Sequence, residues 1–292
     1  MTEPSPQKTL SLIGLGLLGS AVARRWKKMD WEVIGYDVSQ EACDRFRESG
    51  GTVESNLETC LMASERSVFC LPEADVSREV LNSVFQLSEN SRPAFIIDMA
   101  TGAPDLMEDN FKLCQQYGIG YLDACVGGAS SEAEAGDAIL LVGGTVEAVE
   151  TNRSVLEDVS RQVFHVGPAG QGARMKLVTN LVLGLERLAL AEGLSFAKTL
   201  GFDLQATLEV LQAGPARSHV MTTKGAKMVS QEWTPQARLD QHWKDVRLIL
   251  EESRKRKTHL PLTQLHDQIL EKCHHEGWGE LDNSAVIRAY WT

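Results

Sequence analysis

The sequence has no excess of basic residues and no long apolar run. Its 29 Lys and Arg residues are outnumbered by 40 Asp and Glu residues, which gives a net charge of −11. Such a chain lacks the positive field that collects phosphate backbones or anionic lipid, so nucleic acid is excluded as a general partner. The longest apolar stretch, around residues 177–185, is interrupted by polar residues and glycine and is too short to span a bilayer. We therefore expect no membrane partner either.

Paired cysteines and clustered metal ligands are also lacking. The six cysteines are scattered, with no C-x-x-C pair, which favours a reducing compartment. The run Cys273-His274-His275 places its side chains on different faces of a predicted helix, so we predict no metal site. The first residues, MTEPSPQK, contain no apolar core of a secretory signal. The expected location is the cytoplasm.

Length and composition indicate an ordinary folded protein. The 292 residues are 43% hydrophobic and 24% charged, which disfavours wholesale disorder. About 150 residues per domain is a usual size, so two domains are expected.

The first half alternates short β-branched or apolar runs with helical patterns, as a parallel sheet with crossover helices requires. The predicted strands are residues 10–13, 32–36, 67–71, 94–98, 121–126, 139–142 and 163–166. The expected fold class is α/β, with an open, doubly wound Rossmann-type sheet in a first domain of residues 1–167.

A cluster of glycines and proline at residues 167–172 ends the strand pattern. Apolar residues then recur every three or four positions over residues 173–200, which predicts one long helix that stops near Gly201. Further helices are predicted at residues 204–212, 222–229, 240–252 and 262–274. The second domain, residues 168–292, should be all α. Because no flexible spacer separates the halves, we expect the long helix to begin at the boundary, with a cleft there.

A G-x-G-x-x-G pattern follows the first predicted strand and precedes a helical run. Gly14 permits a tight turn, Gly16 lets the backbone approach a pyrophosphate, and Gly19 lets helix and strand pack closely. This context predicts a dinucleotide site. The loop residues assigned to cofactor binding are Gly14, Leu15, Gly16, Leu17, Leu18 and Gly19.

Asp37 ends the second predicted strand, near the usual offset of the acid that binds the adenosine ribose. A carboxylate there accepts hydrogen bonds from ribose hydroxyls but repels a 2′-phosphate. The next residues, Val38-Ser39-Gln40, bring no cation. NAD is therefore expected as the cofactor, and NADP is disfavoured.

Over nearly its whole length the chain resembles the β-hydroxyacid dehydrogenase family, which includes 3-hydroxyisobutyrate dehydrogenase and tartronate semialdehyde reductase. The resemblance rests on six ordered motifs, which are the glycine loop, Cys70-Leu71-Pro72, Asp98-Met99-Ala100-Thr101, Asp123-Ala124-Cys125-Val126-Gly127-Gly128, the segment 172–180 and Lys244-Asp245. It implies a helical 6-phosphogluconate dehydrogenase-like second domain, a small-molecule substrate and a homodimer or homotetramer.

The resemblance implies that Lys176, in the G-x-x-x-K-x-x-x-N signature, is catalytic and that Asn180 is its substrate-side companion. Residue spacing agrees, because positions i and i+4 share one helical face. Lys176 would pass a proton to or from the substrate oxygen while hydride moves between its carbon and the nicotinamide. The activity implied is interconversion of a small β-hydroxy acid and its semialdehyde or keto form.

Further contacts are carried over by motif. The resemblance implies that Leu71, Pro72, Thr101 and Lys244 contact the cofactor, and that the loop beginning at Gly127 binds substrate.

The substrate loop departs from the family pattern. Gly127 stands where the family has Ser, which leaves the backbone N–H groups of Gly127 and Gly128 as donors. Ala100 and Ala237 also replace usual family residues, and two of the three changes shrink side chains near the expected pocket. The role of Cys125 and the substrate stay open. Two alternatives remain, namely an imine reductase-like enzyme and a non-catalytic NAD(P)-binding scaffold or sensor.

Overall fold

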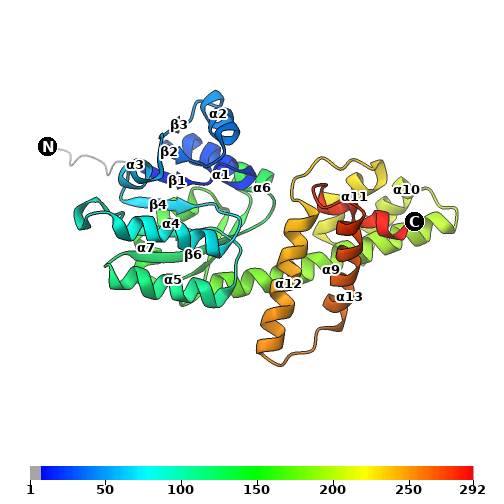
Figure 1. Ribbon diagram of the computed structural model, residues 1–292. Coiled ribbons are helices and arrows are strands. Elements are labelled where there is room, and N and C mark those ends of the chain that lie inside the picture. Colours follow the sequence, from blue (N-terminus) through cyan, green and yellow to red (C-terminus); the bar gives the residue numbers. More distant parts are fainter. Residues whose placement is uncertain (1–7, 292) are drawn as a thin grey trace. The chain divides into compact units, whose positions relative to one another are not determined.

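The computed structural model describes residues 8–291 (Figure 1). Residues 1–7, which make up most of the polar first segment MTEPSPQK, lie outside the described part. The expectation of no secretory signal therefore stays a prediction. The chain divides into two compact units, Met1–Lys176 and Leu177–Thr292. This division lies inside one long helix, a little after the predicted boundary between residues 167 and 168, which stays a prediction. Each unit is described by itself.

Unit 1 is built on an eight-stranded sheet with strand order β3-β2-β1-β4-β5-β6-β7-β8. The strands are β1 (Thr9–Ile13), β2 (Glu32–Tyr36), β3 (Thr52–Val53), β4 (Arg66–Phe69), β5 (Phe95–Asp98), β6 (Gly120–Gly127), β7 (Ile139–Gly143) and β8 (Gln162–Gly167). All paired strands are parallel except β6 and β7. The doubly wound α/β fold is confirmed.

Two details of the sheet differ from the sequence prediction. β7 runs antiparallel to β6, with Asp123 opposite Gly143 and Gly127 opposite Ile139, so the expectation of a parallel sheet is wrong for this pair. An antiparallel partner needs no long crossover, and only the short segment 128–138 joins these strands. The two-residue strand β3, too short for a periodic pattern, was not predicted.

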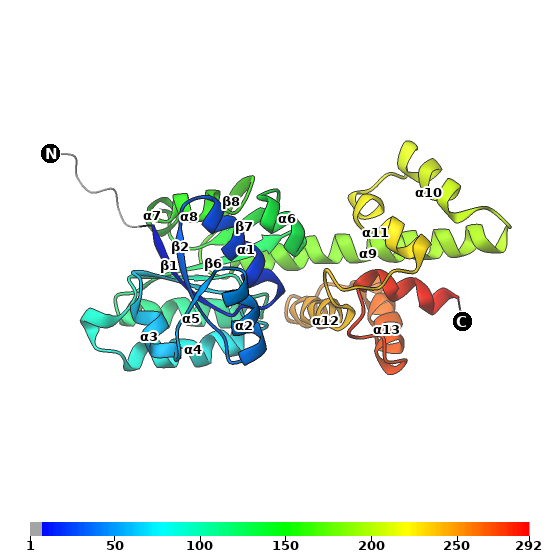
Figure 2. The same ribbon diagram turned by 90° about the horizontal axis from the view of Figure 1, so that it is seen from above.

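Helices cover both faces of the sheet (Figure 2). They are α1 (Leu17–Lys28), α2 (Gln40–Glu48), α3 (Leu57–Met62), α4 (Ala74–Gln86), α5 (Pro104–Gln116), α6 (Ser130–Ala135), α7 (Val146–Thr151) and α8 (Arg153–Glu157), with a 3₁₀ turn η1 (Glu89–Ser91). Leu10 and Leu12 of β1 pack into a core with Trp26 of α1, whereas Ile13 belongs to a second core with Leu81 of α4. This alternation buries both faces, as crossover helices require.

Unit 2 contains helices and no named strand within residues 177–291. Its elements are the C-terminal part of α9 (Gln171–Thr199), then α10 (Leu204–Ala213), α11 (His219–Ser230), α12 (Leu239–Lys255), α13 (Pro261–His275) and the 3₁₀ helix η2 (Asn283–Tyr290). Gly201 adopts φ +82°, and Phe202 N–H returns to Ala197 O, which ends α9 where the sequence predicted. Leu194, Val246 and Leu270 pack together in the hydrophobic core of unit 2.

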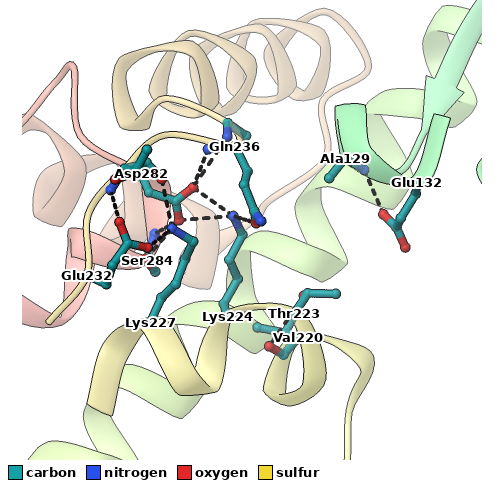
Figure 3. Close-up of polar contacts among 12 residues, drawn as sticks. Ala129, Glu132, Val220, Thr223, Lys224, Lys227, Glu232, Gln236, Asp282 and Ser284 are labelled. Carbon is teal, nitrogen blue, oxygen red and sulfur yellow. Dashed lines mark hydrogen bonds and ion pairs between the residues drawn. The ribbon is translucent and has the colours of Figure 1, made fainter. Parts of the chain in front are cut away.

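A buried ion pair joins three segments of unit 2 (Figure 3). Lys224 Nζ on α11 donates to both carboxylate oxygens of Asp282, each at 2.9 Å. Asp282 also accepts hydrogen bonds from Gln236 N and from Ser284 N and Oγ. Asp282 is fully buried, and only 6% of the surface of Lys224 is exposed. One carboxylate thus ties α11 to the segment before α12 and to the start of η2.

The run Cys273-His274-His275 lies at the C-terminal end of α13 in unit 2. His274 Nδ1 lies 2.9 Å from Asp240, and Cys273 packs in the helical core. In the described part of the chain, no three His, Cys, Asp or Glu side chains gather as metal ligands. Within residues 8–291, none of the helices combines the length and apolar character needed to cross a membrane.

Candidate active site

The glycine loop between β1 and α1 has the geometry that its spacing predicts. Gly14 adopts φ +98°, and a Cβ on Gly19 would overlap the carbonyl oxygen of Gly14. A Cβ on Gly16 would meet nothing within 4 Å, so the loop presents open backbone there. Gly16 precedes α1 without a side-chain cap, and the first turn carries no acidic residue. The N–H groups of this turn therefore suit a pyrophosphate.

Asp37 is held against the same loop. Its Oδ2 accepts Leu15 N–H at 2.7 Å and its Oδ1 accepts Ser39 N–H at 2.8 Å. Gly14 N–H donates to Tyr36 O at 2.9 Å, so the end of β2 lies beside the turn. The carboxylate keeps further lone pairs, as an acid that binds ribose hydroxyls requires. The residues present thus fit a dinucleotide.

The other cofactor residues predicted in unit 1 lie at the same edge of the sheet. Leu71 and Pro72 follow β4, and Thr101 follows β5. Since β1, β4 and β5 are parallel neighbours, their carboxyl ends meet at one edge. The chain order reverses between β1 and β4, and ligands of doubly wound sheets bind at such a switch point.

Lys176 lies near the end of β6. Its Nζ donates to Val126 O at 2.7 Å, and Val126 directly precedes Gly127 and Gly128. The structure thus brings the predicted catalytic amine beside the predicted substrate loop. This contact lies within unit 1.

The substrate loop explains part of the departure from the family pattern. A Cβ on Gly127 would approach Cγ1 of Ile139 to 2.7 Å, so the serine of the family would require Ile139 to move. Gly128 adopts φ +150°, a conformation that favours glycine. Ala129 N–H donates to Glu132 Oε2 at 2.7 Å (Figure 3), so this N–H group is already occupied within the loop.

Cys125, whose role the sequence left open, is fully buried. Its Sγ donates to Ala100 O at 3.3 Å, so the thiol packs against the strand end that precedes Thr101.

Asn180 and Lys244 lie in unit 2, where Asp245 joins them. Asn180 Nδ2 donates to Asp245 Oδ2 at 2.8 Å, and Lys244 Nζ lies 3.6 Å from Asp245 Oδ1. The predicted site residues therefore form two groups, one in each unit. Lys176 and Asn180 are one turn apart on α9.

Two buried carboxylates beside the site were not identified as functional from the sequence. Asp98 and Asp123 are opposite each other on β5 and β6, and both are fully buried. Burial raises the pKa of each to about 6, although N–H donors favour the charged form. Asp98 accepts from Ala100 N–H and Tyr121 O–H. Asp123 accepts from Gly170 and Ala173 N–H at the start of α9.

Comparison with known proteins supports a nicotinamide-binding fold. The family described as the NAD-binding domain of 6-phosphogluconate dehydrogenase matches residues 9–167. The family described as NAD-binding of NADP-dependent 3-hydroxyisobutyrate dehydrogenase matches residues 170–290. Together the two matches cover both halves of the chain and indicate a nicotinamide dinucleotide as the cofactor.

Individual relatives match over most of this chain. It is 29% identical over 283 residues to 2-(hydroxymethyl)glutarate dehydrogenase of Eubacterium barkeri, covering 96% of this chain and 94% of that protein. It is 25% identical over 287 residues to the cytokine-like nuclear factor N-PAC of Drosophila melanogaster, covering 97% of this chain but 47% of that protein. A 3-hydroxyisobutyrate dehydrogenase structure from Salmonella typhimurium has the same fold, with a TM-score of 0.87, 21% identity and coverage of 96% and 99%. The chain belongs to the β-hydroxyacid dehydrogenase family.

Proposed function

We propose that the protein is an NAD-dependent oxidoreductase that interconverts a small β-hydroxy acid and its semialdehyde or keto form, with Lys176 as general acid and base. The observation that carries this proposal is the 2.7 Å bond from Lys176 Nζ to Val126 O, at the entrance of the Gly127–Gly128 loop. A bound nicotinamide would accept or donate hydride.

The residues of the chain would transfer the proton and bind the substrate carboxylate. In the reduction direction, the Lys176 ammonium polarises the substrate carbonyl and gives it a proton. In oxidation, the neutral amine takes the hydroxyl proton. The N–H groups of Gly127 and Gly128 would bind the carboxylate, and Asn180 would contact the substrate. Leu71, Pro72, Thr101 and Lys244 would line the cofactor. We place the enzyme in the cytoplasm, as a homodimer or homotetramer.

Turnover tests the proposal against its alternatives. We expect the purified protein to turn over at least one compound from a panel of β-hydroxy acids and semialdehydes, which NADH absorbance would report. Cyclic imines should give no change in NADH absorbance. Turnover of imines alone would favour an imine reductase.

Gly127 and the similarity to the nuclear factor N-PAC favour a second candidate, a scaffold that binds NAD(P). Calorimetric binding of NADH without any turnover would support that candidate.

The choice of cofactor is tested at Asp37. We expect kcat/KM to be at least about tenfold higher with NADH than with NADPH, because the Asp37 carboxylate repels a 2′-phosphate. Asp37→Asn keeps the shape and an oxygen for Leu15 N–H but removes the charge. The preference should fall about tenfold, which equals about 1.4 kcal/mol. Asp44→Asn, at an exposed carboxylate on α2, is the control and should leave the ratio unchanged. A wild-type protein that prefers NADPH would contradict the assignment.

A further inference from the structure

The start of α9 has no capping residue in its own sequence. The segment before it reads Gly167-Pro168-Ala169-Gly170, without the Ser, Thr, Asp or Asn that commonly accepts the first N–H groups of a helix. These N–H groups still need acceptors where they are buried. At α9 the acceptor comes from a different part of the chain.

Asp123 of β6 supplies the missing cap. Its Oδ1 accepts Gly170 N–H and its Oδ2 accepts Ala173 N–H, both at 2.8 Å. A negative charge at this position also complements the positive end of the helix dipole. Both oxygens of one fully buried carboxylate are thus committed to the first turn of α9.

Two glycines allow this close approach. A Cβ on Gly172 would lie 2.5 Å from Leu141 O and 2.7 Å from Asp123 Oδ2. A Cβ on Gly143 would lie 2.8 Å from Pro168 O. Either side chain would push the helix start away from the sheet. Gly172 is also the first residue of the signature that contains Lys176, so its place in that pattern has a steric reason.

Strand β6 contacts both the start of α9 and the amine of Lys176. Asp123 binds the first turn of α9, and Val126, three residues later on β6, accepts the Lys176 ammonium at 2.7 Å. Arg174 adds ion pairs to Asp105 and Glu108 of α5, so loss of the Asp123 contact would shift the helix start rather than detach it.

We propose that Asp123 is a positioning residue, whose carboxylate fixes the first turn of α9 and thereby sets where the Lys176 amine lies beside the Gly127–Gly128 loop. The kinetic part of this inference rests on the proposed function. Asp123 is fully buried and acts through Lys176, so it is not itself a catalytic residue.

Asp123→Asn tests the inference with little change of shape. The amide keeps one oxygen acceptor but directs an N–H₂ group at the other helix N–H, and the charge is lost. We expect kcat to fall about 30-fold, the Kd for NADH to stay within twofold, and the isotope effect with 4-deuterated NADH to rise as hydride transfer becomes limiting. Small displacements of reacting groups can cost this much.

A matched control separates positioning from stability. Asn152 is another fully buried polar residue of unit 1, with bonds to Ala148 O at 2.9 Å and Arg66 Nε at 3.1 Å. Asn152→Ala should lower the melting temperature of the protein without changing kcat or the isotope effect. If both variants lose kcat in proportion to lost stability, the positioning role is wrong.

A measurement without turnover keeps the inference separate from the proposed function. The rate at which acetic anhydride acetylates Lys176, followed by mass spectrometry, should change several-fold in Asp123→Asn and remain unchanged in Asn152→Ala. Failure of the wild type to turn over any substrate, with this change present, would reject the function but keep the positioning role. Normal wild-type turnover with unchanged acetylation and kcat in Asp123→Asn would reject the positioning role alone.

Discussion

Replacing Lys176 by alanine is expected to lower kcat about 10³-fold, the largest kinetic effect of any single substitution in the protein. General acid and base catalysis contributes about 10² to 10⁴ in rate, and no other ammonium is assigned to the proton transfer. The Kd for NADH should change little, because we propose that the glycine loop and Asp37, rather than this side chain, bind the cofactor. Stopped-flow absorbance of NADH would measure the chemical step directly.

Chemical rescue distinguishes a missing amine from a damaged helix. Methylamine added to Lys176→Ala should restore part of the turnover, with a rate that rises with the concentration of amine. Lys112→Met, at an exposed lysine on α5 that pairs with Asp109, is the control and should keep wild-type kcat. A folded Lys176→Ala variant with full turnover would show that the proton passes through another group.

The geometry of the candidate dinucleotide site was predictable because its signals are local. A glycine pattern between a strand and a helix fixes Gly14, Gly16 and Gly19, and the next strand end fixes Asp37. The structure places all four at one edge of the sheet, beside the loops that follow β4 and β5. Consecutive residues carry this information, so tertiary structure adds little to it.

The support for Lys176 was not predictable in the same way. Asp123 is far from Gly170 and Ala173 in sequence, and only folding brings its carboxylate to their N–H groups. The absence of a capping residue before α9 was the available signal, because it implies an acceptor from elsewhere. Asp245, which joins Asn180 to Lys244, likewise depends on the packing of α12 against α9.

The reversed strand illustrates a limit of periodicity. Apolar residues alternate in the same way in parallel and antiparallel strands, so residues 139–142 predict a strand but not its direction. The shortness of the segment 128–138 was the relevant signal, since a parallel crossover usually needs a dozen residues or more. The reversal matters for the site because it places Ile139 opposite Gly127, where a larger side chain would collide.

The buried pair Lys224–Asp282 should dominate the stability of unit 2. Among the described residues, Asp282 is the carboxylate that forms an ion pair with Lys224. Asp282→Asn removes this negative charge and leaves buried cations without a compensating anion. Arg187 is one of them, since burial lowers its pKa to about 10 while the charge of Asp282 opposes that shift. Removal of one partner of such a pair typically costs about 3–5 kcal/mol. We expect a loss of this size in the free energy of unfolding of unit 2.

The reverse substitution should cost less. Lys224→Met leaves Asp282 with N–H donors from Gln236 and Ser284 and with the nearby charge of Arg187. The double variant should be more stable than the sum of the single losses predicts, because it no longer buries the unpaired Lys224 ammonium. Glu251→Gln, which breaks an exposed pair with Lys255 on α12, should change stability little.

Hydrogen exchange in increasing urea measures these losses segment by segment, which matters because two units need not unfold together. Peptides from α11 and η2 should report the loss in Asp282→Asn, whereas peptides from β1 and β4 should not. Equal losses of stability for Lys224→Met and Asp282→Asn would show that Arg187 does not compensate the charge of Asp282 when Lys224 is absent. An additive double variant would show that the Lys224–Asp282 contact is energetically neutral, and that Asp282 stabilises unit 2 only through its bonds to backbone N–H groups.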